Sequence, residues 1–241
     1  MLLAVDAAQI EWRTIVELAD EPVGFQEIKD KEDAHSKNQV AFNLPSRLIA
    51  KIYLFRTIFR GSGYAFSMDP QFSHVSSNPK FWDEVNTKFY EKYNGIDKKH
   101  HEWADLVMRG EPIVSPFGRE WLIEPGLDFR GDVKIPWTVL TNYPVQGTAA
   151  DIMMLARLSY YRRVKESGIP CLFISTVHDS IVLDYPNEED TQALVNIAHQ
   201  VFDDLIPNIR KIFGYGWKTP LACEAKMGLD MKNMVEIPRT A

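Results

Sequence analysis

The sequence predicts an α+β fold in which the two ends of the chain form an antiparallel sheet and a helical region is inserted between them. Apolar, β-rich runs lie near both ends, at 1–5, 171–177 and 181–185. Helical periodicity, with start and stop signals, dominates the stretch between them. No internal repeat is present, which excludes a solenoid.

Composition excludes several functional classes. The 241 residues are 45% hydrophobic and 25% charged, enough for a sizeable core. The apolar runs are too short to cross a bilayer, and Asp6 follows the first run too closely for a secretory signal. Two cysteines exclude a disulfide framework and a Cys-rich zinc site. The net charge of −6 excludes a protein that coats DNA by bulk charge, but not an enzyme with a local basic surface. We therefore expect no membrane partner and a cytoplasmic location.

In the first half of the chain, residues 1–5 predict a buried strand and residues 9–18 a helix, followed by a mostly connecting segment at 21–37. Residues 45–61 predict a helix, because Pro45 lies near its start and glycines follow its end. Prolines and small polar residues predict a loop at 67–80. Amphipathic helices are expected at 81–93 and 98–108.

In the second half, prolines and glycines predict short strands and loops at 110–137. A helix is expected at 148–167, where Gly168 and Pro170 stop it. The runs at 171–177 and 181–185 predict a hairpin around a tight turn. A further helix at 188–213 and a last strand at 221–225 complete the expected order.

Two acidic residues stand where predicted strands end. Asp6 leaves the first strand just before a helix, and Asp179 lies at the tip of the hairpin. Acids on neighbouring strands can hold two divalent cations about 4 Å apart, and hard oxygen ligands suit Mg²⁺. Taken singly, each has a simpler interpretation, as a cap at a strand–helix junction or as a turn aspartate.

Residues Arg47, Lys51, Phe55 and Phe59 recur every four positions on a predicted helix. At roughly 100° per residue they form one stripe. Two cations followed by two aromatic rings suit a triphosphate with its sugar and base. The alternative is a core-facing aromatic stripe flanked by solvated cations, and this segment alone favours neither.

Together these segments resemble the family A DNA polymerases, the group of bacterial DNA polymerase I and many phage replicases. The run Asp6-Ala-Ala-Gln-Ile-Glu-Trp-Arg13 matches the first motif, whose pattern is Asp-x-Ser-Gln-Ile-Glu-Leu-Arg. The stripe matches the second motif on the fingers helix, and His178-Asp179 matches the third. The stretch 142–151 matches the lead into a palm helix. Weaker similarities lie at 33–35, 117–119 and 220–224. The motifs follow the family order along the whole chain.

The resemblance implies a right-hand polymerase fold that lacks the thumb. An antiparallel-sheet palm would comprise residues 1–40 and 140–241, the latter with the third-motif hairpin at 171–185. Helical fingers would comprise residues 41–139, with the second-motif helix at 45–61.

The resemblance also implies a template-directed DNA polymerase that adds deoxynucleoside triphosphates to a primer by two-metal chemistry. Two Mg²⁺ ions, which Mn²⁺ can replace, would be held by Asp6, Asp179 and the backbone carbonyl of Ala7. Lys51 would join the two acids in catalysis by protonating the leaving pyrophosphate. Glu11 would exclude the 2′-hydroxyl of ribonucleotides. The implied nucleotide-binding residues are Arg47, Lys51, Phe55, Phe59, Glu11, Gln9 and His35. Those implied to contact primer–template DNA are Asn142, Gln146, His178 and Arg13.

Several positions depart from the family pattern. Ser180 stands where the third motif has Glu, and Phe59 stands where the second has Tyr. Arg56 and Arg60 replace small residues and lie off the stripe, where they reach DNA or a partner or are simply solvated. Thr138 stands where an Arg is expected.

Two other functions compete with the DNA polymerase. One is a catalytically silent DNA-binding subunit, which the presence of both acids disfavours. The other is a single-subunit RNA polymerase, which Glu11 disfavours. A Ser-His-Asp hydrolase is excluded, because His178, Asp179 and Ser180 are consecutive. The pair His100-His101 is expected at the surface.

The sequence also suggests a polymerase divided between two polypeptides. Met1 lies five residues before Asp6, whereas in the family a thumb, part of the palm and usually a 3′–5′ exonuclease precede that strand. We expect a second polypeptide that carries thumb and exonuclease and covers an open sheet edge. The alternative is a fragment of a longer chain. Divergent motifs suggest a phage-encoded protein acting in the cytoplasm of a bacterial host.

Overall fold

The computed structural model of the chain describes residues 1–240. By internal contacts it divides into two compact units, which are described separately. The first comprises residues 1–10 and those from 148 onward, and the second comprises residues 11–147. The division into palm at 1–40 and 140–241 and fingers at 41–139 stays a prediction.

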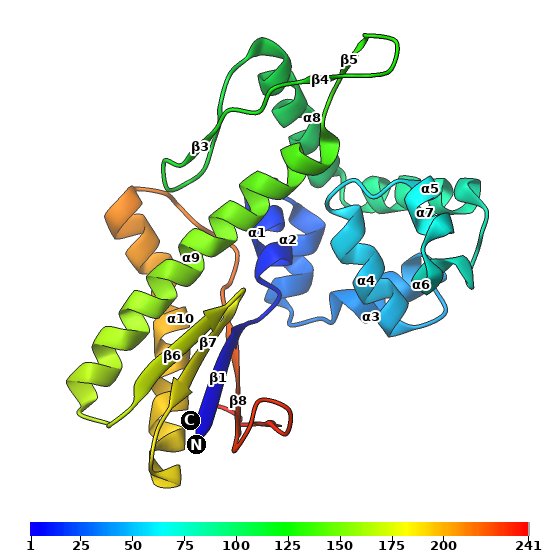
Figure 1. The fold of residues 1–241 in the computed structure, drawn as a ribbon. Coiled ribbons are helices and arrows are strands. Elements are labelled where there is room, and N and C mark those ends of the chain that lie inside the picture. Colours follow the sequence, from blue (N-terminus) through cyan, green and yellow to red (C-terminus); the bar gives the residue numbers. More distant parts are fainter. Residues whose placement is uncertain (241) are drawn as a thin grey trace. The chain divides into compact units, whose positions relative to one another are not determined.

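The first unit is built on an antiparallel five-stranded sheet with strand order β6-β7-β1-β8-β9 (Figure 1). The sheet joins the two ends of the chain, which confirms the predicted α+β architecture. Its first strand is central, because its apolar residues are buried between two partners. The strands are β1 (Leu2–Ala7), β6 (Leu172–Val177), β7 (Ser180–Asp184), β8 (Cys223–Gly228) and β9 (Val235–Glu236).

Two long helices complete this unit. Helix α10 (Thr191–Phe213) follows a 3₁₀ turn, η1 (Glu188–Asp190), and packs its buried apolar stripe against β1 and β8. Helix α9 (Trp137–Ser167) is tied in by Tyr160, whose ring centroid lies 5.4 Å from that of Phe173. The Tyr160 hydroxyl donates a hydrogen bond to the Leu194 carbonyl of α10 at 3.0 Å. Helix α9 begins eleven residues before the expected start at 148, because Pro144 lies within it rather than ending it.

The second unit is helical, with two small hairpins. Its core contains a cluster of stacked and edge-on aromatic rings, formed by Tyr53, Phe66, Phe72, Trp82 and Phe89. The helices are α1 (Ile10–Leu18), α2 (Pro22–Lys29), α3 (Ala34–Ala41), α4 (Arg47–Thr57), α5 (Gly63–Met68), α6 (Pro70–Ser73), α7 (Pro79–Lys92) and α8 (Asn94–Arg109). The hairpins pair β2 (Ile113–Val114) with β3 (Glu120–Trp121) and β4 (Gly126–Leu127) with β5 (Val133–Lys134).

Two segments expected to be irregular contain short helices. Residues 21–37 include α2 and the start of α3, and residues 67–80 include α6 and the end of α5. Each of these helices has an N-cap side chain that accepts a backbone N–H. Helices of four to eight residues bury few apolar side chains, so their periodicity is weak in sequence. Within residues 1–240, no helix is both long enough and apolar enough to cross a bilayer.

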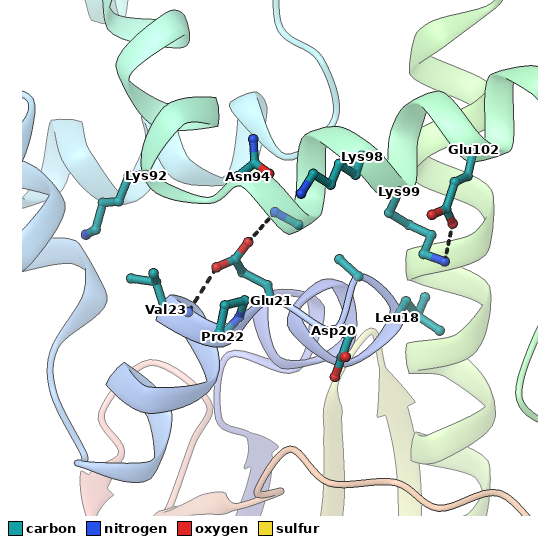
Figure 2. Close-up of a pocket in the computed structure, with 12 residues that line it drawn as sticks. Leu18, Asp20, Glu21, Pro22, Val23, Lys92, Asn94, Lys98, Lys99 and Glu102 are labelled. Carbon is teal, nitrogen blue, oxygen red and sulfur yellow. Dashed lines mark hydrogen bonds and ion pairs between the residues drawn. The ribbon is translucent and has the colours of Figure 1, made fainter.

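Glu21 joins the starts of two helices in the second unit (Figure 2). Its carboxylate accepts hydrogen bonds from the amide of Val23 at 2.9 Å and the amide of Gly95 at 2.6 Å. The side chain is fully buried beneath a pocket of about 400 Å³ that α1, α2 and α8 line. A Cβ on Gly95 would lie 2.8 Å from Glu21 Oε2, so the close approach requires glycine. One buried carboxylate thus caps α2 and α8 together.

We expect Glu21→Ala to lower the free energy of unfolding by about 2–4 kcal/mol, because it leaves buried amides of two helix termini without acceptors. Urea denaturation followed by circular dichroism measures the loss. Glu102→Ala in the same pocket is the control. It removes only an exposed ion pair with Lys99 and should cost less than about 0.5 kcal/mol. Equal losses in the two variants would contradict the double-cap role.

Candidate active site

The antiparallel register places Asp6 beside the tip of the hairpin. Asp6 lies opposite Ser180 of β7 on one side and opposite Glu224 of β8 on the other. The amide of Ala7 donates to the Asp179 carbonyl at 2.9 Å. Because directly paired residues have Cα atoms about 4.5–5.5 Å apart, Asp6 lies beside Asp179, the loop residue that immediately precedes β7. The structure therefore brings together the two acids that the sequence proposed as metal ligands.

Asp6 and Asp179 are partly exposed because they lie at the end of the β1–β7 pair. Val5 and Ile181 are fully buried, whereas the residues beside them, Asp6 and Ser180, are partly exposed. The period of two puts their side chains on opposite faces of the sheet. Ala4 and Val182, which share a face with Asp6, are buried, so the exposed part of this face lies at the strand ends beside Asp6 and Ser180. Gln9, with φ of 52°, then turns the chain into α1.

The hairpin tip holds a residue in the left-handed region. His178 is the first of two loop residues between β6 and β7 and has φ of 53°. Two-residue hairpin loops favour such angles, which Gly or Asn usually supplies. An exposed histidine there costs backbone free energy, as often happens at functional sites. The strained tip holds Asp179 next to β1.

The donor set of Asp6 and Asp179 fits Mg²⁺ in one respect. Both ligands are hard carboxylate oxygens, and Mg²⁺ usually binds through one or two carboxylates and completes its shell with water and substrate phosphates. Within residues 1–240, no three His, Cys, Asp or Glu side chains converge on a single cation position. The serine at 180 is consistent with this two-acid set. An ion bound here would depend on phosphate oxygens for the rest of its coordination.

In the second unit, α4 presents the predicted stripe on its accessible side. Arg47 and Lys51 are exposed and Phe55 is partly exposed, while the opposite face of the helix is buried. The buried face comprises Ile49, Ala50, Tyr53, Leu54 and Thr57. The cations are therefore accessible to a ligand, whereas Phe55 and Phe59 are partly buried and pack against the core. The alternative of a core-facing aromatic stripe flanked by solvated cations stays open. The helix ends at Thr57, so Phe59 lies in the following turn rather than on the expected helix to 61.

His35 lies under this stripe. The residue is only 2% exposed, and the centroid of its ring lies 5.9 Å from that of Phe55. Burial lowers the pKa of His35, and the positive charges of Arg47 and Lys51 lower it further against the opposing effect of Asp33. His35 Nδ1 has no hydrogen-bond partner among residues 1–240. A neutral imidazole therefore stands next to two cations and a partly exposed ring.

Two more of the predicted residues are joined directly. Gln146 Nε2 of α9 donates to Glu11 Oε1 of α1 at 2.9 Å, across 135 residues of sequence. Asn142 lies one helical turn before Gln146, on the same face of α9. Arg13 lies on α1, two residues after Glu11. The residue expected to exclude a 2′-hydroxyl thus contacts one expected to touch the primer–template.

Arg56, Arg60 and His100 have partners that the sequence did not predict. Arg56 pairs with Asp69 at 2.5 Å, and Arg60 pairs with Asp97 at 2.7 Å. Arg60 also donates to His100 Nδ1 at 3.0 Å, so it is neither solvated nor extended toward a partner. His100 is fully buried, which corrects the expectation of a surface histidine pair, and burial holds its pKa well below the usual value. In the sequence, the one local indication of these contacts is Asp97, which lies four residues before His101 and so on the same face of a helix.

Comparisons with known proteins identify the fold and the family of the chain. The solved POL domain of Pol1 from M. smegmatis, in complex with a DNA primer-template and dNTP, superposes with a TM-score of 0.75 at 18% identity. The match covers 94% of this chain and 39% of that one, and shows that the chain has the fold of a polymerase domain. The profile of DNA polymerase family A matches residues 1–233, and the chain belongs to that family.

Curated relatives include two bacterial DNA polymerases. DNA polymerase I of Caldicellulosiruptor bescii is 24% identical over 95% of this chain and 26% of its own length. The thermostable DNA polymerase I of Thermus aquaticus is 26% identical over 86% of this chain and 25% of its own length. The chain therefore spans about a quarter of the curated relatives that it matches.

The strained hairpin tip gives a stability prediction. We expect His178→Val to lower the free energy of unfolding by about 1–2 kcal/mol, because a β-branched residue tolerates positive φ poorly. We expect His178→Gly to change it by less than about 1 kcal/mol, since relief of strain offsets the entropy of the unfolded chain. Urea denaturation measures the free energy of unfolding of both variants. Equal stability of the two would contradict a strained φ at position 178.

Proposed function

We propose that this chain is the palm and fingers part of a DNA polymerase that adds deoxynucleoside triphosphates to a primer 3′ end in a template-directed reaction. The observation that supports it most is the register of β1 and β7, which sets Asp6 beside the hairpin loop that contains Asp179. Because the chain belongs to DNA polymerase family A, we interpret this pair of acids as metal ligands. The proposed setting is the cytoplasm.

Metal binding and phosphate binding are assigned to different residues of the candidate site. Asp6 and Asp179, with the carbonyl of Ala7, would hold two Mg²⁺ ions. Bound ions supply charge stabilisation for the attacking and leaving oxygens of an in-line phosphoryl transfer. Lys51 would neutralise charge on the leaving pyrophosphate and donate a proton to it. Arg47 would bind the same phosphates through its forked N–H groups.

The other residues would select the nucleotide and hold the primer–template. Phe55 and Phe59 would pack on sugar and base, with His35 and Gln9 completing that binding site. Glu11, which Gln146 holds by a hydrogen bond, would fill the space of a 2′-hydroxyl and so favour deoxynucleotides.

On the DNA side, Asn142 and Gln146 would contact the minor groove, where all four correct pairs offer similar acceptors. Contacts there test the shape of a pair without reading its sequence. His178 and Arg13 would hold the primer strand.

We expect Asp6→Asn and Asp179→Asn each to abolish nucleotide incorporation, with the fold preserved. Each change removes a charged ligand in a site where ions stabilise developing charge. Lys51→Ala should lower turnover by at least about 10²-fold. Primer extension in Mg²⁺ measures all three, and Asp184→Asn, an exposed acid at the other end of β7, is the control. Near-normal incorporation by either acid variant would refute the two-acid site.

A second proposal concerns the rest of the polymerase domain. This chain corresponds to 39% of the solved POL-domain chain. Strand β6 is an edge strand of the sheet, and its Leu172, Ile174 and Val177 are exposed. Leu158 and Tyr161 of α9 are exposed beside it and line a hollow of about 310 Å³ together with Ile174. We propose that a second polypeptide, carrying thumb and 3′–5′ exonuclease, covers this apolar edge.

If so, the isolated chain should extend a primed template poorly, and the polypeptide that co-purifies with it from its native source should restore extension. Ile174→Glu should prevent restoration, because it places a charge in the apolar edge. Val40→Glu, at an exposed apolar position outside that edge, should not. Primer extension by each component and by the mixture is the measurement. An isolated chain that is monomeric and processive, or a native polypeptide of much larger mass, would contradict the divided polymerase.

A further inference from the structure

Asp33 makes an unusually complete set of contacts at the base of the cationic stripe. It caps α3, since its Oδ1 accepts the amide of His35 at 3.2 Å, and its Oδ2 accepts the Ser36 hydroxyl at 2.5 Å. Arg47 reaches the same carboxylate with two donors, Nε to Oδ2 at 2.5 Å and Nη2 to Oδ1 at 3.1 Å. Each oxygen accepts two hydrogen bonds, which fills the roughly four acceptor positions of a carboxylate.

This saturation fixes the carboxylate in position and in charge. The hydrogen bonds from Arg47 lower the pKa of Asp33 well below its usual value, with Ser36 and the His35 amide adding to the effect against the cost of burial. Asp33 is thus an anion at any working pH, and its orientation is set by the first turn of α3 rather than by its own rotamer freedom. A fixed acceptor of this kind can orient the long side chain that binds it.

The contacts use one edge of the guanidinium and leave the other. Arginine carries five N–H groups, of which Asp33 takes one from Nε and one from Nη2, leaving three. Within residues 1–240, no other group is seen to bind the Nη1 edge of Arg47. That edge presents parallel donors in the spacing that a phosphate accepts. Asp33 and a phosphate can therefore bind Arg47 at the same time.

We propose that Asp33 is a positioning residue that holds Arg47 with its Nη1 edge ready for the terminal phosphate of the incoming nucleotide. This rests on the proposed function, which assigns the triphosphate to Arg47 and Lys51. An unrestrained, exposed arginine would have to be ordered when the nucleotide binds. Asp33 orders it beforehand, so that nucleotide binding does not bear this entropy cost.

The same helix carries a matched pair that does not belong to the stripe. Arg56 of α4 binds Asp69 at 2.5 Å, and Asp69 caps α6 by accepting the amide of Gln71 at 2.7 Å. The two pairs therefore share residue types, helix and capping role, although Arg56 binds its aspartate through one donor and its guanidinium also lies 5.0 Å from the centroid of the Phe72 ring. Their positions on the helix differ, because Arg56 lies about 180° around it from Arg47, off the row of Arg47, Lys51 and Phe55.

The test measures binding of dATP in Mg²⁺ to the full chain by calorimetry. Asp33→Asn keeps a good N-cap while it removes the charge and one oxygen acceptor. We expect it to raise the dissociation constant about 3–10-fold, the size expected for ordering one long side chain. Asp69→Asn should leave the constant within a factor of two. Melting temperatures of all variants confirm that the fold is kept.

A double-mutant cycle separates positioning from a general structural effect. If Asp33 acts through Arg47, adding Asp33→Asn to Arg47→Ala should weaken dATP binding no further. In the extending complex, Asp33→Asn should raise the KM for nucleotide while kcat stays within twofold. Unchanged or tighter dATP binding by Asp33→Asn, an equal loss in Asp69→Asn, or an additive loss in the double variant would each overturn the proposal.

Lys51→Ala distinguishes this failure from failure of the proposed function. If Lys51→Ala weakens dATP binding and Asp33→Asn does not, the positioning role alone is wrong. If the wild-type chain binds dATP no better than Lys51→Ala, the assignment of the triphosphate fails, and the role of Asp33 fails with it.

Discussion

The pairing of β1 between β7 and β8 is the constraint on which the proposed chemistry depends. A strand has a side-chain period of two, so a slip of one residue would move the Asp6 side chain to the opposite face of the sheet and put an apolar neighbour in its place. The buried residues Leu3 and Val5 oppose such a slip, because exposing them would cost burial free energy. Backbone bonds close to the acid reinforce the register. The amide of Ala7 binds the Asp179 carbonyl, and the amide of Ala8 binds the carbonyl of Ala222. The position of the acid is thus a by-product of sheet packing.

In the second unit, cations remain accessible on a helix whose opposite face is buried in the core. Helix α4 buries an apolar face against an aromatic cluster and leaves Arg47 and Lys51 exposed. Exposed ion pairs contribute little to stability, so the pairing of Arg47 with Asp33 is better explained by geometry than by energy. By contrast, the buried carboxylate of Glu21 contributes mainly to stability. The more exposed carboxylate of Asp33 thus orients a side chain, whereas the buried carboxylate of Glu21 stabilises the fold.

The sequence predicted the elements whose patterns are long and the site residues that belong to motifs. The hairpin at 171–185, helix α10 and the neighbouring placement of Asp6 and Asp179 could be predicted, since periodicity and motif order point to each. Helices α2, α3 and α6 could not, because their stability depends on caps and tertiary contacts rather than on an apolar stripe. The burial of His100 and its bond to Arg60 depend on residues forty positions apart, which no local pattern reports. The early start of α9 was missed because Pro144, usually a helix breaker, lies inside it.

The central claim is that two carboxylates, one on β1 and one in the adjoining hairpin loop, share divalent cations with an incoming triphosphate. Anomalous diffraction tests this claim most directly. Crystals of the chain with primer–template DNA and a deoxynucleotide would be soaked in Mn²⁺. The account predicts two anomalous peaks about 4 Å apart, both within coordination distance of Asp6 and Asp179. Peaks elsewhere on the chain, or none at these two side chains with nucleotide bound, would contradict it.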